Sequence, residues 1–229
     1  MTELIKEGER LDDLKRDGLF IIQNPDWFCF GMDAVLLSEF ASAREDDECI
    51  DLCTGGGVIP LLMSARSKSG SFHGLELNPD VADMAKRSVM YNDLQDRISI
   101  ECGDLKDAVD IYGARSADVI TVNPPYLPVG GGLINPTGHK AMARHEICAT
   151  LDDVIRVSAK LIRSLGHFYM VHRPSRLAEI ITLMTIHKLE PKTLRLVQPR
   201  MGDAPNMVLI EAMWSRQDIF ICGFKMAAW

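Results

Sequence analysis

Short apolar runs alternate with longer amphipathic segments from about residue 48 to residue 214. Runs with the length of buried strands lie at 49–53, 71–77, 98–104, 117–122, 167–172, 192–199 and 206–214. Segments with apolar residues at helical spacing separate most of them, at 58–67, 80–93, 151–165 and 175–188. The alternation predicts an α/β fold with a seven-stranded, mostly parallel sheet and helices on both faces. The last two runs are joined by a short turn, which predicts an antiparallel hairpin at the C-terminal end.

Composition and charge narrow the class of protein. The chain has 229 residues, 47% hydrophobic and 25% charged, which is enough for one α/β domain with a substantial core. No apolar run approaches the roughly 20 residues of a membrane helix, and the charged start lacks a signal-peptide core, so we expect a cytoplasmic protein without a membrane partner. The six cysteines form no Cys-x-x-Cys pair, so we expect reduced thiols and no metal. The net charge of −7 argues against broad affinity for nucleic acid but leaves a local basic face open.

A glycine-rich turn and two acids follow the first three predicted strands. In DLCTGGGVIP, Gly55 and Gly57 let the backbone turn tightly, and the exposed N–H groups suit a polar or anionic ligand. Glu76 ends the second strand, where a carboxylate can accept both hydrogen bonds of a ribose diol. Asp104 closes the third strand, where a carboxylate can accept from an adenine amino group. A glycine-rich turn and an acid at the end of the next strand are also typical of nicotinamide dinucleotide sites, but this turn lacks the G-x-G-x-x-G spacing. The non-functional alternative is that the turn is only a tight strand-to-helix connection.

The stretch Asn123-Pro124-Pro125-Tyr126 comes directly after the fourth strand and opens an irregular segment at 123–148. An exocyclic amine is a poor nucleophile because its lone pair is delocalised, and two acceptors on its hydrogens can turn that lone pair toward an electrophile. The Asn123 side-chain oxygen and the Pro124 carbonyl are two such acceptors, and proline holds its own backbone rigid. Tyr126 offers a face for stacking a planar substrate group. The alternative is a proline-rich turn with a capping asparagine.

Taken in order, the segments from Asp51 to Gly57, at Glu76, at Asp104 and from Asn123 onward resemble the class I S-adenosylmethionine-dependent methyltransferases. The resemblance implies a Rossmann-like sheet, S-adenosylmethionine as cofactor and S-adenosylhomocysteine as product. It places Asp51 near the methionine end, Glu76 on the ribose and Asp104 near the adenine. The cofactor-binding set that it implies is Asp51, Cys53, Thr54, Gly55, Gly57, Glu76, Leu77, Asp104, Leu105 and Asn123. The family usually has glycine where Cys53 stands.

Two further stretches are similar to the bacterial tRNA(Val) N6-adenine methyltransferases, which act on adenine 37. They are residues 9–41, which contain FCFGMDAVLL, and the MARHE sequence at 142–146. This resemblance implies tRNA as the partner and places Phe30 and Asp33 near the methionine part of the cofactor. The catalytic residues that it implies are Asn123, Pro124 and Tyr126, and the implied substrate contacts are Pro125, Tyr126, Lys140, Arg144 and His145.

The resemblance divides the chain into an N-terminal lid or substrate segment at 1–45, the methyltransferase domain at 46–214 and a C-terminal tail at 215–229. Asn-Pro-Pro-Tyr is shared with the protein-glutamine N5-methyltransferases of release factors, which are the main alternative. That family carries a separate helical domain before the sheet. Here fewer than 50 residues precede CIDLC, and they lack the pattern of a helical bundle. A non-catalytic cofactor-binding module is a further alternative, and we expect a monomer or weak dimer.

Overall fold

A computed structural model describes residues 4–27, 29–68, 70–126, 149–214 and 225–226. Within these ranges the main sheet has eight strands in the order β10-β8-β9-β7-β6-β3-β4-β5. Their bounds are β3 (Glu48–Leu52), β4 (Ser71–Glu76), β5 (Ile98–Cys102), β6 (Ala117–Val122), β7 (Ile162–His172), β8 (Leu189–Val197), β9 (Met207–Trp214) and β10 (Lys225–Met226). The seven longer strands confirm the predicted sheet. The two-residue β10 beside β8 is an addition that the sequence pattern did not indicate.

The strands of this sheet run parallel except for β9. β3 pairs with β4 and β6, β4 with β5, β6 with β7, and β10 with β8, all in parallel. β9 is antiparallel to both β7 and β8, which confirms the predicted C-terminal hairpin. Parallel strands end at the same edge of a sheet, so the segments that follow β3 to β7 meet at one edge.

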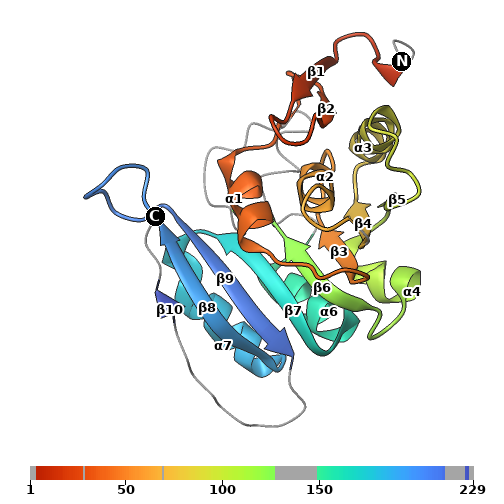
Figure 1. Cartoon of the computed structure of the whole chain (residues 1–229). Coiled ribbons are helices and arrows are strands. Elements are labelled where there is room, and N and C mark those ends of the chain that lie inside the picture. Colours follow the sequence, from red (N-terminus) through yellow and green to blue (C-terminus); the bar gives the residue numbers. More distant parts are fainter. Residues whose placement is uncertain (1–3, 28, 69, 127–148, 215–224, 227–229) are drawn as a thin grey trace.

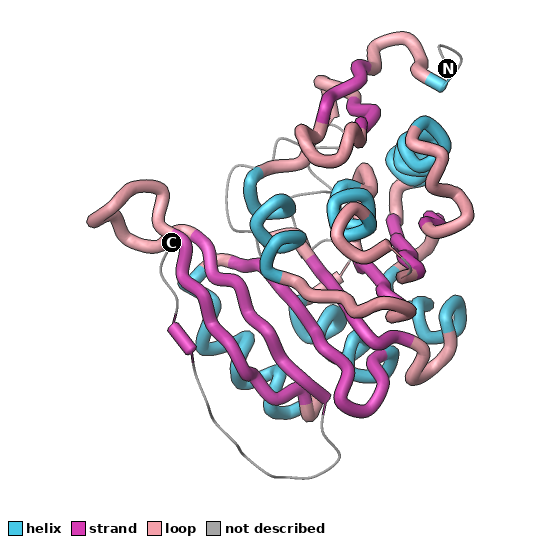
Figure 2. Tube along the Cα trace, viewed as in Figure 1, coloured by secondary structure: helices cyan, strands magenta, loops and turns pink. Residues whose placement is uncertain are grey.

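Helices cover both faces of the sheet, as the sequence predicts (Figure 1). One face carries α1 (Met32–Phe40), α2 (Val58–Ser64) and α3 (Pro79–Tyr91). The other face carries α4 (Ala108–Tyr112), α6 (Leu151–Leu161) and α7 (Leu177–Ile186). Side chains alternate between the two cores along each strand: on β3, Cys49 joins the first, while Ile50 and Leu52 join the second. Figure 2 shows the strands as a layer between these helices.

The predicted helix at 151–165 is wrong over its last four residues. Its start is firmly set, because the Thr150 hydroxyl oxygen and the Asp153 carboxylate accept from each other's backbone N–H, both at 3.1 Å. The helix ends at Leu161, and β7 begins at Ile162, which is buried and pairs with Ala117 of β6. Extending the helix would forfeit this pairing and the burial of Ile162, so the strand takes these residues.

An antiparallel hairpin precedes α1 and was not indicated by the sequence. It consists of β1 (Arg10–Asp13) and β2 (Phe20–Gln23), and it packs on α3. The Ile22 N–H donates to the Ser88 hydroxyl at 2.9 Å. The Asn92 side chain accepts from the Phe20 N–H at 2.9 Å and donates to the Phe20 carbonyl at 2.7 Å. Side chains of α3 and of Asn92, the residue that follows it, therefore satisfy backbone groups of β2 that face away from β1.

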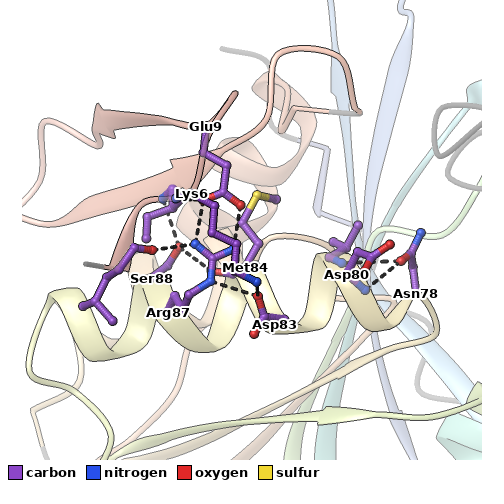
Figure 3. A network of polar contacts seen from close by, with 11 residues as sticks. Lys6, Glu9, Asn78, Asp80, Asp83, Met84, Arg87 and Ser88 are labelled. Atoms are coloured by element: carbon purple, nitrogen blue, oxygen red, sulfur yellow. Dashed lines mark hydrogen bonds and ion pairs between the residues drawn. The ribbon is translucent and has the colours of Figure 1, made fainter. Parts of the chain in front are cut away.

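Ahead of the hairpin, a network of ion pairs fastens the chain to the same helix (Figure 3). The Glu9 carboxylate accepts two hydrogen bonds of 2.6 Å from the Arg87 guanidinium, and both side chains are nearly buried, with exposed fractions of 4% and 10%. Arg87 also donates to Asp83 at 2.9 Å, and Asp83 pairs with the exposed Lys6 at 2.7 Å. These contacts hold the N-terminal segment against α3.

Candidate active site

The loops after β3, β4, β5 and β6 enclose a cavity of about 150 Å³ at the carboxyl edge of the sheet. Of the residues predicted to bind a cofactor, Cys53, Thr54, Gly55, Glu76, Leu77 and Asp104 line this cavity. Phe30, Leu105 and Asn123 line it as well, and so does Pro125, which was predicted to contact substrate. Asp33, Asp51, Gly57 and Tyr126 do not. The glycine-rich turn and the Asn-Pro-Pro-Tyr stretch thus share one cavity.

Sequence reasoning missed part of the cavity wall. Ile21 and Gln23 reach it from β2, and Val81 and Met84 reach it from α3. The two α3 residues lie three apart on the inner face of an amphipathic helix, a spacing that indicates burial but not a ligand. The two β2 residues share one face of a strand that no sequence signal indicated, so their place depends on the docking of the hairpin.

The turn after β3 uses backbone conformations that favour glycine. The φ angles of Gly55 and Gly57 are 55° and 81°, and that of Cys53 is 59°. A Cβ on Gly57 would lie 3.4 Å from the Cβ of Ala85 on α3, whereas a Cβ on Gly55 would meet nothing within 4 Å. Gly57 is therefore favoured by its positive φ, and it does not line the cavity. Cys53 carries a left-handed strain of roughly 1–2 kcal/mol that glycine would avoid.

Glu76 fastens the glycine turn to the end of β4. Its Oε2 accepts from the Gly55 N–H and its Oε1 from the Asn78 N–H, each at 2.9 Å. Burial raises the pKa of this carboxyl, although these backbone hydrogen bonds favour its charged form. A carboxylate oxygen accepts more than one hydrogen bond, so Glu76 retains capacity for hydroxyl donors in the cavity. After β5, Asp104 accepts from the Lys106 N–H at 2.9 Å and also lines the cavity.

Asp51 lies below the turn rather than in the cavity. Its two carboxyl oxygens accept from the hydroxyls of Thr54 and Thr121, each at 2.6 Å, and the side chain is buried. Burial raises the pKa of Asp51 to about 7, with the charge of Glu76 acting in the same direction. The acid therefore joins β3, β6 and the turn in one hydrogen-bonded unit beneath the site.

Within the Asn-Pro-Pro-Tyr stretch, the tyrosine hydroxyl contacts the asparagine side chain. The Tyr126 hydroxyl donates to Asp33 Oδ2 at 2.8 Å and also contacts the Asn123 side-chain oxygen. A phenol has one proton, and the Asp33 carboxylate is the stronger acceptor. Turning the Asn123 amide by 180° satisfies all three groups, because its NH₂ then donates to the phenol oxygen. In that arrangement the Asn123 carbonyl oxygen is free to accept from another donor.

His172, the last residue of β7, and Arg173, the next residue, both contact the Tyr126 ring. The Arg173 guanidinium carbon lies 5.2 Å from the ring centroid, and the His172 ring meets the tyrosine edge-on at 5.2 Å. Burial lowers the pKa of His172 to about 4, so this imidazole is neutral at pH 7. Burial likewise raises the pKa of Tyr126 far above its ordinary value, helped by the Asp33 charge. At pH 7 Tyr126 is therefore a neutral hydrogen-bond donor.

Some sequence predictions cannot be placed. Lys140, Arg144 and His145, predicted to contact substrate, lie outside the described residues, as does most of the predicted tail at 215–229. Within the described ranges, no three His, Cys, Asp or Glu side chains are grouped as metal ligands would be. In the same ranges, no helix combines the length and the apolar character that crossing a bilayer requires.

Comparison with known families identifies the class of enzyme. The model of the methyltransferase small domain matches residues 31–187, which is more than half of the chain and includes every strand from β3 to β7. The chain belongs to this family. Membership confirms the predicted enzyme class, a methyltransferase that uses S-adenosylmethionine.

Curated relatives of this methyltransferase share a modest sequence identity with it. A tRNA1(Val) (adenine(37)-N6)-methyltransferase of Porphyromonas gingivalis is 28% identical over 197 residues, covering 83% of this chain and 76% of the relative. A protein of the same name from Aeromonas salmonicida is 28% identical over 181 residues, covering 79% and 74%.

Solved structures share the fold at lower identity. A predicted O-methyltransferase from Agrobacterium tumefaciens has a TM-score of 0.67 at 22% identity and covers 86% of both chains. TYW2 from P. horikoshii, in complex with MeSAdo, has a TM-score of 0.65 at 14% identity and covers 91% of this chain and 72% of its own. These likenesses confirm the Rossmann-like sheet predicted from the sequence.

Proposed function

We propose that this methyltransferase transfers a methyl group to the exocyclic N6 of an adenine in tRNA, with adenine 37 of tRNA(Val) as the target. The observation that carries the proposal is that Asn123 lines the same cavity as Glu76 and Asp104. An acceptor for an amine thus faces the acids that suit a nucleoside cofactor. The names of the curated relatives support the choice of tRNA. The predicted cytoplasmic location follows from this substrate.

The cavity fits S-adenosylmethionine by the chemistry of its wall. Glu76 offers acceptors for the ribose hydroxyls, and Asp104 offers one for the adenine amino group. Leu105 and Val81 supply apolar contacts for a purine ring, and the open space at Gly55 lets a ligand approach the backbone. When bound, the cofactor supplies an electrophilic methyl group on a positively charged sulfonium.

The residues after β6 orient the nucleophile. The Asn123 side-chain oxygen and the Pro124 carbonyl accept from the two hydrogens of the target NH₂, which turns the nitrogen lone pair toward the methyl group. The ring of Pro124 fixes its φ near −65°, and the following Pro125 confines the ψ of Pro124 to the extended region, so the Pro124 carbonyl needs little ordering when substrate binds. Asp33 fixes the Tyr126 hydroxyl at 2.8 Å, and the hydroxyl in turn fixes the Asn123 amide. Positioning of this kind supplies much of the rate in a displacement.

Tyr126 supplies the stacking face for the target base. To reach Asn123 the base must leave its neighbours, and this costs least for a base in a single-stranded loop. An anticodon-loop adenine meets that condition, whereas a base inside a duplex does not.

Transfer of labelled methyl groups separates this proposal from the glutamine alternative. The protein is incubated with methyl-labelled cofactor and with either an unmodified tRNA(Val) transcript or a purified release factor. We expect the label in the RNA, because the acids and the amide occupy one cavity and the curated relatives act on tRNA. Label in the release factor with none in the RNA would overturn the proposal.

A further inference from the structure

Arg173 stands beside the Asn-Pro-Pro-Tyr stretch at the carboxyl edge of the sheet. β6 and β7 are parallel neighbours, with Val122 opposite Met170, so the residues that follow them leave the sheet side by side. Arg173 is exposed, and its guanidinium lies over the ring of Tyr126. The side chain therefore caps the aromatic face on which a planar substrate group would stack.

In the part of the chain that the structure describes, the Arg173 guanidinium contacts a backbone carbonyl rather than a carboxylate. Its Nη1 donates to the Asn206 carbonyl at 3.1 Å, and within the described residues it has no ion pair with a carboxylate. Arg176, in the same turn, donates to Glu179 at 2.7 Å. The neighbouring His172 is neutral at pH 7 because burial lowers its pKa to about 4. Among the described residues, Arg173 is thus an exposed cation without a carboxylate partner, and it lies beside Tyr126, whose hydroxyl contacts Asn123.

We propose that Arg173 binds a phosphate of the target nucleotide and so holds the base against Tyr126. The inference rests on the proposed function, because it takes the substrate to be RNA. The guanidinium fork matches two oxygens of a phosphate, which is the geometry that gives strong charge-assisted hydrogen bonds. A chain with a net charge of −7 repels RNA at long range, so cations close to the site have to supply local attraction.

The position over the ring gives Arg173 a second role before RNA binds. In the structure the guanidinium covers Tyr126, which limits contact of that aromatic face with water. A base that stacks on Tyr126 takes this place, and the guanidinium moves to the phosphate of the same nucleotide. One side chain therefore protects the stacking face and then positions its occupant.

The salt dependence of RNA binding tests the phosphate contact. A fluorescent anticodon stem–loop of tRNA(Val) is titrated with S-adenosylhomocysteine-saturated protein at several salt concentrations. We expect Arg173→Gln to weaken binding at least about tenfold at low salt. We also expect the slope of log K against log salt to fall by about 0.7, the value for one phosphate contact on a single strand. An unchanged slope would overturn the assignment, since loss of packing alone does not alter the number of ions released.

Arg163→Gln is the matched control. Arg163 lies near the other end of β7, is exposed, and pairs with Asp118 at 2.5 Å. We expect this variant to bind the stem–loop like wild type, and an equal loss in both variants would refute a specific role for Arg173. Cofactor affinity, measured by calorimetry, is expected to stay unchanged in Arg173→Gln.

Replacing single phosphates of the RNA locates the contact. A methylphosphonate placed on either side of the target adenosine removes one phosphate charge. At one of these two positions, we expect the modified RNA to bind wild type as weakly as the unmodified RNA binds Arg173→Gln. The same modification is expected to cause no further loss of affinity in Arg173→Gln. If the losses from the variant and from the methylphosphonate add fully at both positions, the phosphate assignment is contradicted but the proposed tRNA substrate is not.

Two other outcomes are distinct from this one. Failure of wild type to bind the stem–loop at all refutes the tRNA substrate. Weaker labelling of a release factor by Arg173→Gln assigns Arg173 to a protein carboxylate instead.

Discussion

Asp51 links the stability of the cofactor-free protein to pH. Burial raises its pKa to about 7 from an ordinary 3.8, so the folded protein keeps a proton that the unfolded chain loses above pH 4. The contribution of Asp51 therefore falls as pH rises from about 4 to about 7, by at most about 1.4 kcal/mol per pH unit, and then levels off. Asp51→Asn cannot ionise, so its unfolding temperature is expected to fall less over this range and to exceed that of wild type at pH 8.

Thermal unfolding of both proteins between pH 5 and pH 8 checks this expectation. Glu76 also has a raised pKa and contributes in the same direction in both proteins, so only the difference between the two curves reports on Asp51. Parallel curves would contradict the account of a buried, protonated Asp51.

Single residues show what sequence reasoning can and cannot place. Glu76 lies at the end of one predicted strand and Asn123 comes directly after another, and both line the cavity at the carboxyl edge of the sheet. Asp51 lies inside β3, where side chains alternate between faces, and the hydroxyls of Thr54 and Thr121 draw it beneath the turn. Hydrogen-bond partners that are 70 residues apart in the chain leave no pattern in the sequence.

At the scale of elements, the β1–β2 hairpin is the main feature that the sequence did not indicate. Each strand has four residues, and RLDD has no apolar alternation. The hairpin and the residues before it are stabilised by Arg87 and Ser88 of α3 and by Asn92, which follows that helix, all far along the chain. Because such strands are stable only in their tertiary setting, local propensity cannot predict them.

The buried ion pair of this segment predicts a local effect on cofactor binding. Glu9→Gln leaves the nearly buried Arg87 with Asp83 as its remaining acid partner, and breaking buried pairs typically costs about 3–5 kcal/mol. We expect backbone amides at 10–23 to exchange hydrogen faster. Cofactor affinity should fall several-fold, since Ile21 and Gln23 line the cavity. Hydrogen exchange followed by mass spectrometry, together with calorimetry, measures both.

Lys6→Gln is the control for this prediction. It breaks the ion pair with Asp83, whose side chains are 60% and 48% exposed, and exposed pairs contribute about 0–1 kcal/mol. We expect neither exchange nor affinity to change. A Glu9→Gln variant that behaves like Lys6→Gln would show that the pair does not hold the hairpin in place.

At the scale of the whole molecule, the sequence predicts the architecture well because each strand and helix has a strong period of its own. Strand alternation on β3 and helical spacing on α3 each bury one face, and the parallel connections then bring the site to one edge. The α6–β7 boundary is where prediction failed, since pairing of Ile162 with Ala117 outweighs local helical pattern. The division of the chain at residues 45 and 214 stays a prediction.

The identity of the methylated atom tests the central claim most directly. A tRNA(Val) transcript is incubated with cofactor and either wild type or Asn123→Ala, and its nuclease fragments and nucleosides are analysed by mass spectrometry. We predict N6-methyladenosine at position 37 with wild type. With Asn123→Ala we predict product formation at least about 100-fold slower, while calorimetry shows nearly unchanged cofactor affinity. Methylation at a ring nitrogen or carbon, or an Asn123→Ala variant as active as wild type, would contradict the account.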